Sequence, residues 1–196
     1  MRKLIREDAI LIPDDATCVY KGTVFSVFQW PQVMYDGSVQ TFEMLKRDDA
    51  AGAICIVDDK LLVQTEEQPH SNTRVNFPGG HVDPEDESTL AAAQREIREE
   101  TGYSFTNWRL IKVWQPYGKS ENFIYLYLAW GVESQTEPLD LPGERIMVQA
   151  LSFDEVKQKV YAREGYLGDD IDIFEKVSTL EELMQLPECT GVQVDR

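Results

Sequence analysis

Gly79–Tyr103, GGHVDPEDESTLAAAQREIREETGY, is the stretch that decides how the chain folds. It begins with paired glycines, passes through an acidic loop, and continues into a segment of helical pattern. Ser88 has the side chain of a helix N-cap, and Gly102 is the residue type that most often follows a helix C-terminus. We therefore predict a helix between these two residues.

Helical geometry divides this segment into a packing stripe and an acidic edge. At about 100° per residue, the apolar residues Leu90, Ala93 and Ile97 share one arc. Glu96 and Glu100 are four residues apart and lie above one another beside that arc. Carboxylates this close repel each other unless a cation lies between them, and Mg²⁺ or Mn²⁺ would suit such oxygen ligands. The alternative is that the glutamates only solvate a helix surface.

Composition limits the classes of protein that need to be considered. The chain has 196 residues, 42% of them hydrophobic, which is enough for one substantial domain. Its formal charge of −16 argues against a nucleic-acid groove, and no apolar run approaches a membrane span. Three widely spaced cysteines and the lack of a signal-peptide pattern favour the cytoplasm. An acidic protein that binds phosphates must also bring in cations.

The pattern of strands and helices predicts an α/β (α+β) layered fold in two parts. Residues 1–48 form a small N-terminal β segment, in which Tyr35–Ser38 makes a hairpin turn. Residues 49–196 form the main domain, in which short apolar strands surround the glutamate-rich helix. Capping boxes at Ser152 and Ser178 predict two later helices, the first ended by Gly165.

The central stretch resembles the Nudix box, G-x5-E-x7-R-E-U-x-E-E-x-G-U, where U is a bulky apolar residue. The matching residues are Arg95, Glu96, Ile97, Glu99, Glu100, Gly102 and Tyr103. Glu87 stands at the expected distance before Arg95, but six residues instead of five separate it from Gly80. Either Asp86 or Glu87 could therefore be the loop carboxylate. We prefer Glu87 because its spacing to the helix is intact.

This resemblance implies a Nudix α/β/α sandwich with a mixed sheet, and an enzyme that hydrolyses nucleoside diphosphate derivatives. By analogy with the family, the divalent metal, Mg²⁺ or Mn²⁺, is held by Glu87, Glu96, Glu99, Glu100 and a carbonyl near Gly79. Arg95 then orients a neighbouring carboxylate through a charge-assisted hydrogen bond.

The N-terminal segment is similar to that of the ADP-ribose pyrophosphatase, or nucleotide-sugar diphosphatase, branch. The similarity lies in Val19–Val27, VYKGTVFSV. In that branch the segment builds a homodimer and its aromatic residues hold the base. Phe28 and Trp30 are the candidates here, although both could equally be core or dimer-interface residues.

A second similarity to this branch lies after the box, in Pro142–Val148. It looks like the mobile loop that supplies a general base, and Glu144 is the candidate. If Glu144 is only solvated, Glu99 or Glu96 would be the base. Arg74, just before the glycine loop, could reach a diphosphate or lie free on the surface.

The branch assignment leaves the substrate open. Asn76–Gly80 departs from the branch's Leu-Pro-Ala-Gly, and Gln115–Gly118 keeps only one of two prolines. ADP-ribose or a related nucleotide sugar is our first expectation, and nucleoside triphosphates or dinucleoside polyphosphates are the alternative. A non-catalytic nucleotide-sugar sensor is disfavoured, because the box glutamates are present and no basic helix-turn-helix segment is found.

Overall fold

The computed structural model describes residues 2–69, 71–139 and 143–195. Its centre is a mixed sheet of order β12-β6-β5-β11-β9, with β7 paired to β6 and β8 paired to β5. β11 runs parallel to β5 and antiparallel to β9, so the mixed sheet is confirmed. The strands are β5 (Ala50–Val57), β6 (Lys60–Glu67), β7 (Arg74–Asn76), β8 (Gly79–His81), β9 (Tyr103–Trp114), β11 (Ile124–Gln135) and β12 (Arg145–Leu151).

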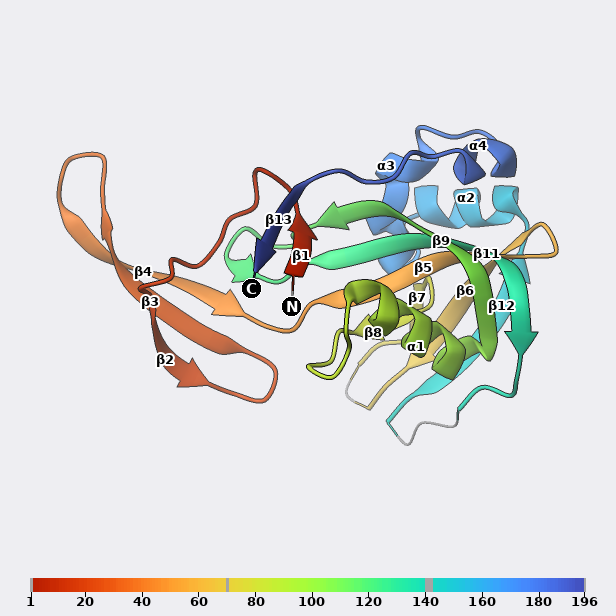
Figure 1. Ribbon diagram of the computed structural model, residues 1–196, viewed down its shortest axis with the longest axis horizontal. Coiled ribbons are helices and arrows are strands. Elements are labelled where there is room, and N and C mark those ends of the chain that lie inside the picture. The colour runs from red at the N-terminus through yellow and green to blue at the C-terminus, as the bar shows by residue number, and fades with distance from the viewer. Residues whose placement is uncertain (1, 70, 140–142, 196) are drawn as a thin grey trace.

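Helices cover this sheet on both faces, as the predicted sandwich requires (Figure 1). On one face α1 (Thr89–Thr101) packs through Ala92, Ala93 and Ile97 onto alternate residues of β5. The other face carries the remaining helices. These are α2 (Phe153–Tyr161), the 3-10 helix η1 (Gly165–Asp170), α3 (Ile171–Phe174) and α4 (Leu180–Met184). Because successive side chains of a strand point to opposite faces, the central sheet contributes to one hydrophobic core under α1 and to a second core under the other helices.

A second sheet forms an arm that projects from this body (Figure 1). It consists of β2 (Thr17–Lys21), β3 (Ser26–Val33) and β4 (Val39–Lys46), with the short β10 (Ser120–Glu121) parallel to β4. The predicted turn joins β3 to β4, and Gly37 adopts the positive φ of 83° that the turn requires. The predicted division between residues 48 and 49 falls between β4 and β5.

The two ends of the chain meet in a third, two-stranded sheet. β1 (Arg2–Ile5) pairs antiparallel with β13 (Val192–Asp195). Lys3 Nζ lies 2.6 Å from Asp49 Oδ2, and Asp49 Oδ1 accepts a hydrogen bond from the backbone of Phe123. This ion pair attaches the N-terminal strand to the main body.

The helix caps follow the sequence closely, with two corrections. Ser152 forms the predicted capping box with Glu155. In the last helix Thr179, not Ser178, is the N-cap, because its hydroxyl accepts from the backbone of Glu182. α2 ends at Tyr161, before the predicted Gly165, which instead begins the following 3-10 helix.

None of the helices in the described ranges is long and apolar enough to cross a membrane.

Candidate active site

The glycine loop brings the backbone against the carboxylate edge of α1. In β8, Gly79 and Gly80 pair with Gly52 and Ala51 of β5. A Cβ on Gly79 would lie 2.3 Å from the Gly52 Cα, and a Cβ on Gly80 would lie 2.5 Å from the Glu96 carboxyl carbon. Real Cβ atoms do not approach this closely, so Gly79 is required for β8 to lie against β5, and Gly80 is required for Glu96 to lie against the loop.

The helix forms between the two predicted caps. The Ser88 hydroxyl accepts from the backbone of Ala91, and Gly102 adopts a left-handed φ of 76°. Its N–H donates to the carbonyl of Arg98, which satisfies one of the last backbone acceptors of the helix. The cap therefore fixes the end of the helix two residues after Glu100.

Glu100 is the most deeply buried carboxylate of the helix. It is 5% exposed, and its two oxygens accept from Gln64 Nε2 at 2.9 Å and from the backbone N–H of Gly79 at 2.7 Å. Burial raises the pKa of Glu100 from its ordinary value of 4.5 to about 8, although these two hydrogen bonds oppose the shift. Burial also raises the pKa of Glu96, against the opposing effect of Arg95. A nearby cation would stabilise the charged form of both carboxylates.

Arg95 connects the helix to the acidic loop. Its Nη1 lies 2.8 Å from Glu96 Oε1 and 3.5 Å from Glu99 Oε2, so both carboxylates share one guanidinium nitrogen. Nη2 also donates to the carbonyl of His81. The expected contact between Arg95 and a neighbouring carboxylate is therefore present, and it orients Glu96 in particular.

The carboxylate that the loop presents to Arg95 is Asp86. Arg95 Nε donates to Asp86 Oδ1 at 3.1 Å and Nη2 donates to Oδ2 at 2.8 Å, which lowers the pKa of Asp86. Glu87 is exposed, and its side chain makes no hydrogen bond or ion pair within the described ranges. Asp86 also keeps the five-residue spacing from Gly80. The geometry favours Asp86 over Glu87 as the loop carboxylate.

Glu144 lies on the same face of the sheet as α1. In the β6–β12 ladder Arg145 is opposite Glu67, so the next pair outward is Glu144 with Gln68. Gln68 Nε2 donates to Glu144 Oε1 at 2.7 Å and to Glu66 Oε1 at 2.5 Å. Pro142, the start of the predicted mobile loop, lies outside the described residues.

Sequence reasoning missed a polar wall formed by Gln64, Glu66 and Asn76. Gln64 and Asn76 are cross-strand partners, and Glu66 is 9% exposed. Gln64 Oε1 and Asn76 Oδ1 are buried and have no hydrogen-bond partner among the described residues. The available signal was the appearance of Gln64 and Glu66, two residues apart and therefore on one face of the strand, after the apolar run 61–63.

Arg74 is half-buried at the edge of this wall. It lies opposite Glu66 in the β6–β7 ladder, and its guanidinium stands 5.2 Å from the ring centre of Tyr166. The guanidinium therefore lies at the edge of the same acidic face, next to an aromatic side chain.

The aromatic candidates of the arm mainly pack against each other. Trp30 is 8% exposed, contacts Phe42 edge to face, and donates its indole N–H to Gln32. Phe28 is partly buried against the same small core, which includes Met44. Within this chain, the geometry favours the alternative that these rings are core residues.

A different basic and aromatic group lies where the arm meets the box. Arg47 stands 5.5 Å from the ring centre of Phe25, and its Nη2 lies 3.0 Å from His81 Nε2. The His81 carbonyl also contacts Arg95, so this group adjoins the acidic loop. These residues were not identified from the sequence.

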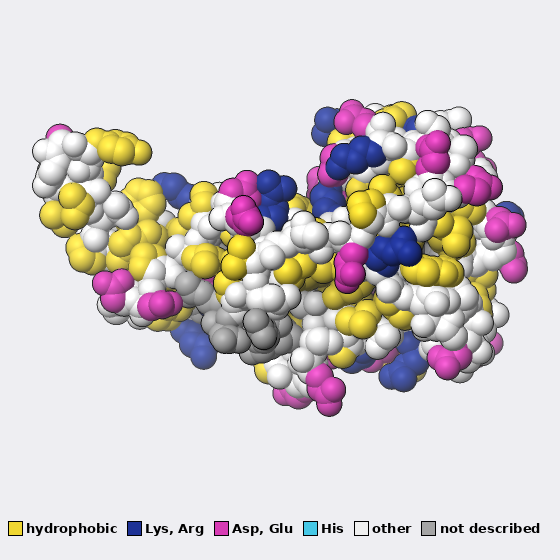
Figure 2. Space-filling model, turned by 45° about the horizontal axis from the view of Figure 1, so that its top comes forward, with side chains coloured by type: hydrophobic (Ala, Val, Ile, Leu, Met, Phe, Trp, Pro, Cys, Tyr) yellow, Lys and Arg dark blue, Asp and Glu magenta, His cyan; other side chains and the backbone are white. Residues whose placement is uncertain are grey.

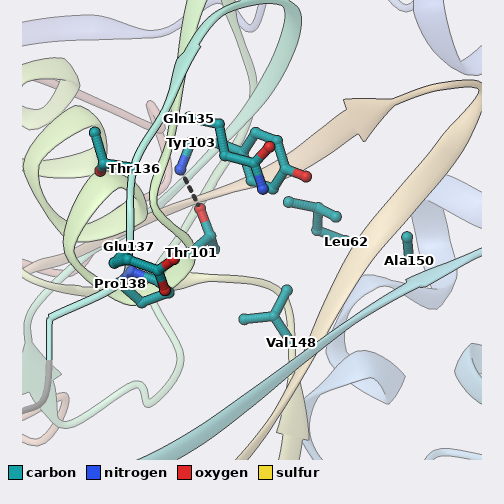
Figure 3. Close-up of a pocket in the computed structure, with 9 residues that line it drawn as sticks. All are labelled: Leu62, Thr101, Tyr103, Gln135, Thr136, Glu137, Pro138, Val148 and Ala150. Atoms are coloured by element: carbon teal, nitrogen blue, oxygen red, sulfur yellow. Dashed lines mark hydrogen bonds between the residues drawn. The ribbon is translucent and has the colours of Figure 1, made fainter.

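A cavity of about 590 Å³ opens beyond the C-terminal end of α1 (Figure 3). Leu62 and Val148 form one side, and Tyr103 and Gln135 stand across from them in the figure. None of the residues lining it is a predicted site residue. The carboxylate site and this cavity are therefore separate parts of the α1 face.

The donor set matches a hard divalent cation in its chemistry, because it consists of carboxylate and carbonyl oxygens. Within the described ranges, however, no group of three or more His, Cys, Asp or Glu side chains is arranged to hold a metal ion. In this arrangement Arg95 contacts one oxygen of Glu96 and one of Glu99.

Comparison with known proteins is decisive for the family. The family model described as the NUDIX domain matches residues 46–169, well over half of the chain. The chain belongs to the Nudix family. The matched range includes β5 to α2 and thus the whole carboxylate site, so the protein is a Nudix hydrolase.

Solved structures share the Nudix fold. One described as an ADP compounds hydrolase has a TM-score of 0.62 and 19% identity, and the match covers 76% of this chain and 81% of that one. A NUDIX hydrolase from Nitrosomonas europaea has a TM-score of 0.52 and 25% identity, with coverages of 69% and 94%. No curated protein sequence matches the chain significantly.

Proposed function

We propose that this Nudix protein hydrolyses the diphosphate linkage of a nucleoside diphosphate derivative with the help of Mg²⁺ or Mn²⁺. One observation carries the proposal: Glu96 and Glu100 are drawn out of water against the paired glycines, where burial raises the pKa of both. Placing like charges in such a position is unfavourable for the fold alone. Binding of a cation together with a diphosphate would explain why these carboxylates are buried at this position.

Glu96, Glu99 and Glu100, with the carbonyl of Gly79, would hold the metal. Asp86 is the proposed loop carboxylate in place of the preferred Glu87, because its contacts with Arg95 hold the acidic loop against the helix. When bound, the metal neutralises the diphosphate and lowers the pKa of an attacking water.

The chain's own side chains supply the other roles. Glu144 is the proposed general base that accepts the proton of the attacking water, with Glu99 or Glu96 as the alternative. Arg74 is the proposed contact for a diphosphate oxygen, supported by its position opposite Glu66 in the β6–β7 ladder. Arg95 holds Glu96 in one orientation.

ADP-ribose or a related nucleotide sugar is the proposed substrate. The support is the N-terminal similarity to the ADP-ribose branch and the fold shared with the ADP compounds hydrolase. Arg47, Phe25 and His81 offer a cationic and aromatic surface for the nucleoside at the base of the arm. Nucleoside triphosphates and dinucleoside polyphosphates remain the second candidate class.

The arm is the proposed homodimer contact. Hydrophobic side chains gather on it, among them the exposed Val19, Tyr20, Val33, Tyr35 and Val39 (Figure 2). A sheet that projects from the body with so much apolar surface is typical of an interaction site. A cytoplasmic location is part of the proposal, supported by three unpaired cysteines and testable by cell fractionation.

Glu100→Gln tests the metal site. The substitution keeps the size of the side chain and a carbonyl acceptor for the Gly79 N–H, but removes the charge. We expect Mg²⁺-dependent hydrolysis to fall at least a hundredfold, because a carboxylate ligand is lost. Circular dichroism should show an unchanged fold. Undiminished turnover in this variant would refute the assignment.

A further inference from the structure

Gln68 lies just after the end of β6 and contacts both β6 and the residue that precedes β12. The amide nitrogen of Gln68 donates to Glu144 at 2.7 Å and to Glu66 at 2.5 Å. An amide NH₂ group has two donors, so one group can hold both carboxylates at once. The contact with Glu144 spans 76 residues of sequence and ties the loop before β12 to the neighbouring strand.

Glu66 is the fixed end of this connection. It is almost fully buried, and its second oxygen lies 3.4 Å from Asn76 Nδ2. Its cross-strand partner is Arg74. Because both of its oxygens already have partners inside the protein, Glu66 is an anchor and not a free base.

Glu144 is the other end of this connection. It precedes the first residue of β12 and is only partly buried, so its position depends on the side chains that contact it. A free glutamate side chain samples several rotamers, and a hydrogen bond to a rigid strand selects among them. Glu66 and Glu144 also repel one another, and a neutral amide donor between them offsets that repulsion.

We propose that Gln68 is a positioning residue: it holds the carboxylate of Glu144 in place for catalysis by linking it to the buried Glu66. The inference rests on the proposed role of Glu144 as general base. Gln68 does not itself contact the reacting atoms. Its effect on the reaction passes entirely through Glu144.

A double-mutant cycle tests this dependence. Gln68→Met keeps the length of the side chain and removes both donors. It is compared with Glu144→Gln, with the double variant, and with the control Glu67→Gln. Glu67 is the neighbouring exposed residue, directed to the opposite face beside Arg145. The kcat, the KM and the melting temperature are measured for the full-length chain with Mg²⁺ and ADP-ribose, or with the substrate that it cleaves fastest.

We expect Gln68→Met to lower kcat about tenfold to a hundredfold, since misplacing a catalytic group has an effect of that order. The KM should change less than about twofold and the melting temperature should stay the same. In the Glu144→Gln background, Gln68→Met should cause no further loss, because the group that it positions is already disabled. Glu67→Gln should behave as wild type.

Four results would overturn the proposal. Gln68→Met could leave kcat unchanged while Glu144→Gln lowers it, or the two losses could multiply in the double variant. If Gln68→Met lowered the melting temperature together with kcat, Gln68 would only stabilise the fold. If Glu144→Gln itself retains full turnover, the proposed base is wrong, and the positioning role is then excluded with it. That last result is distinguishable because Glu100→Gln would still abolish turnover.

Discussion

At the scale of single residues, Glu100 shows the strongest conflict between burial and charge. Its pKa is raised from 4.5 to about 8, mainly because burial penalises the charged form. Two donors, Gln64 and the Gly79 N–H, hold it in place but do not neutralise it. A carboxylate placed this way is stabilised when it is protonated or when it binds a cation.

This conflict predicts a pH dependence of stability in the metal-free protein. Between pH 4.5 and about 8 the folded state keeps a proton on Glu100 that the unfolded state releases. The free energy of unfolding should therefore fall as the pH rises through this window. Glu100→Gln lacks this titrating group. In buffer with a chelator, its melting temperature should therefore fall several degrees less than that of the wild-type protein between pH 5 and 8.5. If the melting temperatures of the two proteins changed with pH in the same way, the raised pKa of Glu100 would be contradicted.

The residues of the helix could be predicted from the sequence, whereas the loop carboxylate could not. Arg95, Glu96 and Glu100 could be placed because helical periodicity fixes their relative positions. The preference for Glu87 was not supported by the geometry, because the turn that closes on Asp86 decides which carboxylate meets Arg95. Spacing along a chain does not reveal where a loop accommodates an extra residue.

At the scale of elements, helices were the most predictable part of the structure. The caps at Ser88, Gly102 and Ser152 act locally, so their sequence signals were sufficient. The sequence signalled the polar wall through Gln64 and Glu66, but the contacts of Glu66 and Gln68 could not be predicted, because they depend on the register of β6 with β7 and β12. Such contacts join segments far apart in the sequence.

The arm provides the prediction at this scale. Val33 and Val39 are cross-strand partners and are 64% and 62% exposed. The double substitution Val33→Lys and Val39→Glu places a favourable opposite-charge pair across the strands while removing the apolar surface. If the arm forms the homodimer contact, sedimentation velocity should show a dimer for wild type and a monomer for the double variant.

The control for this experiment is Val132→Glu, a change at a valine on β11 that is 45% exposed. It should leave the dimer intact. A wild-type protein that stays monomeric at all concentrations, or a double variant that still dimerises, would contradict an interface at the arm.

At the scale of the whole molecule, the acidic charge and the site form a consistent picture. A chain of net charge −16 would repel the proposed phosphate-bearing substrate at long range, and divalent cations bound as proposed would remove that repulsion. The fold places α1 on one face of the sheet, with the loop carrying Glu144 on the same side. The proposed reaction therefore depends on elements drawn from most of the Nudix domain.

The most direct measurement is the cleavage of a substrate panel by the wild-type protein with Mg²⁺ and with a chelator. The panel contains ADP-ribose, other nucleotide sugars, nucleoside triphosphates and dinucleoside polyphosphates, and the products are identified by chromatography and ³¹P NMR. We predict cleavage of ADP-ribose or another nucleotide sugar at the diphosphate linkage, giving a nucleoside monophosphate and a sugar phosphate, with Mg²⁺ only. Cleavage that persists in the chelator, or no cleavage of any diphosphate in the panel, would contradict this prediction.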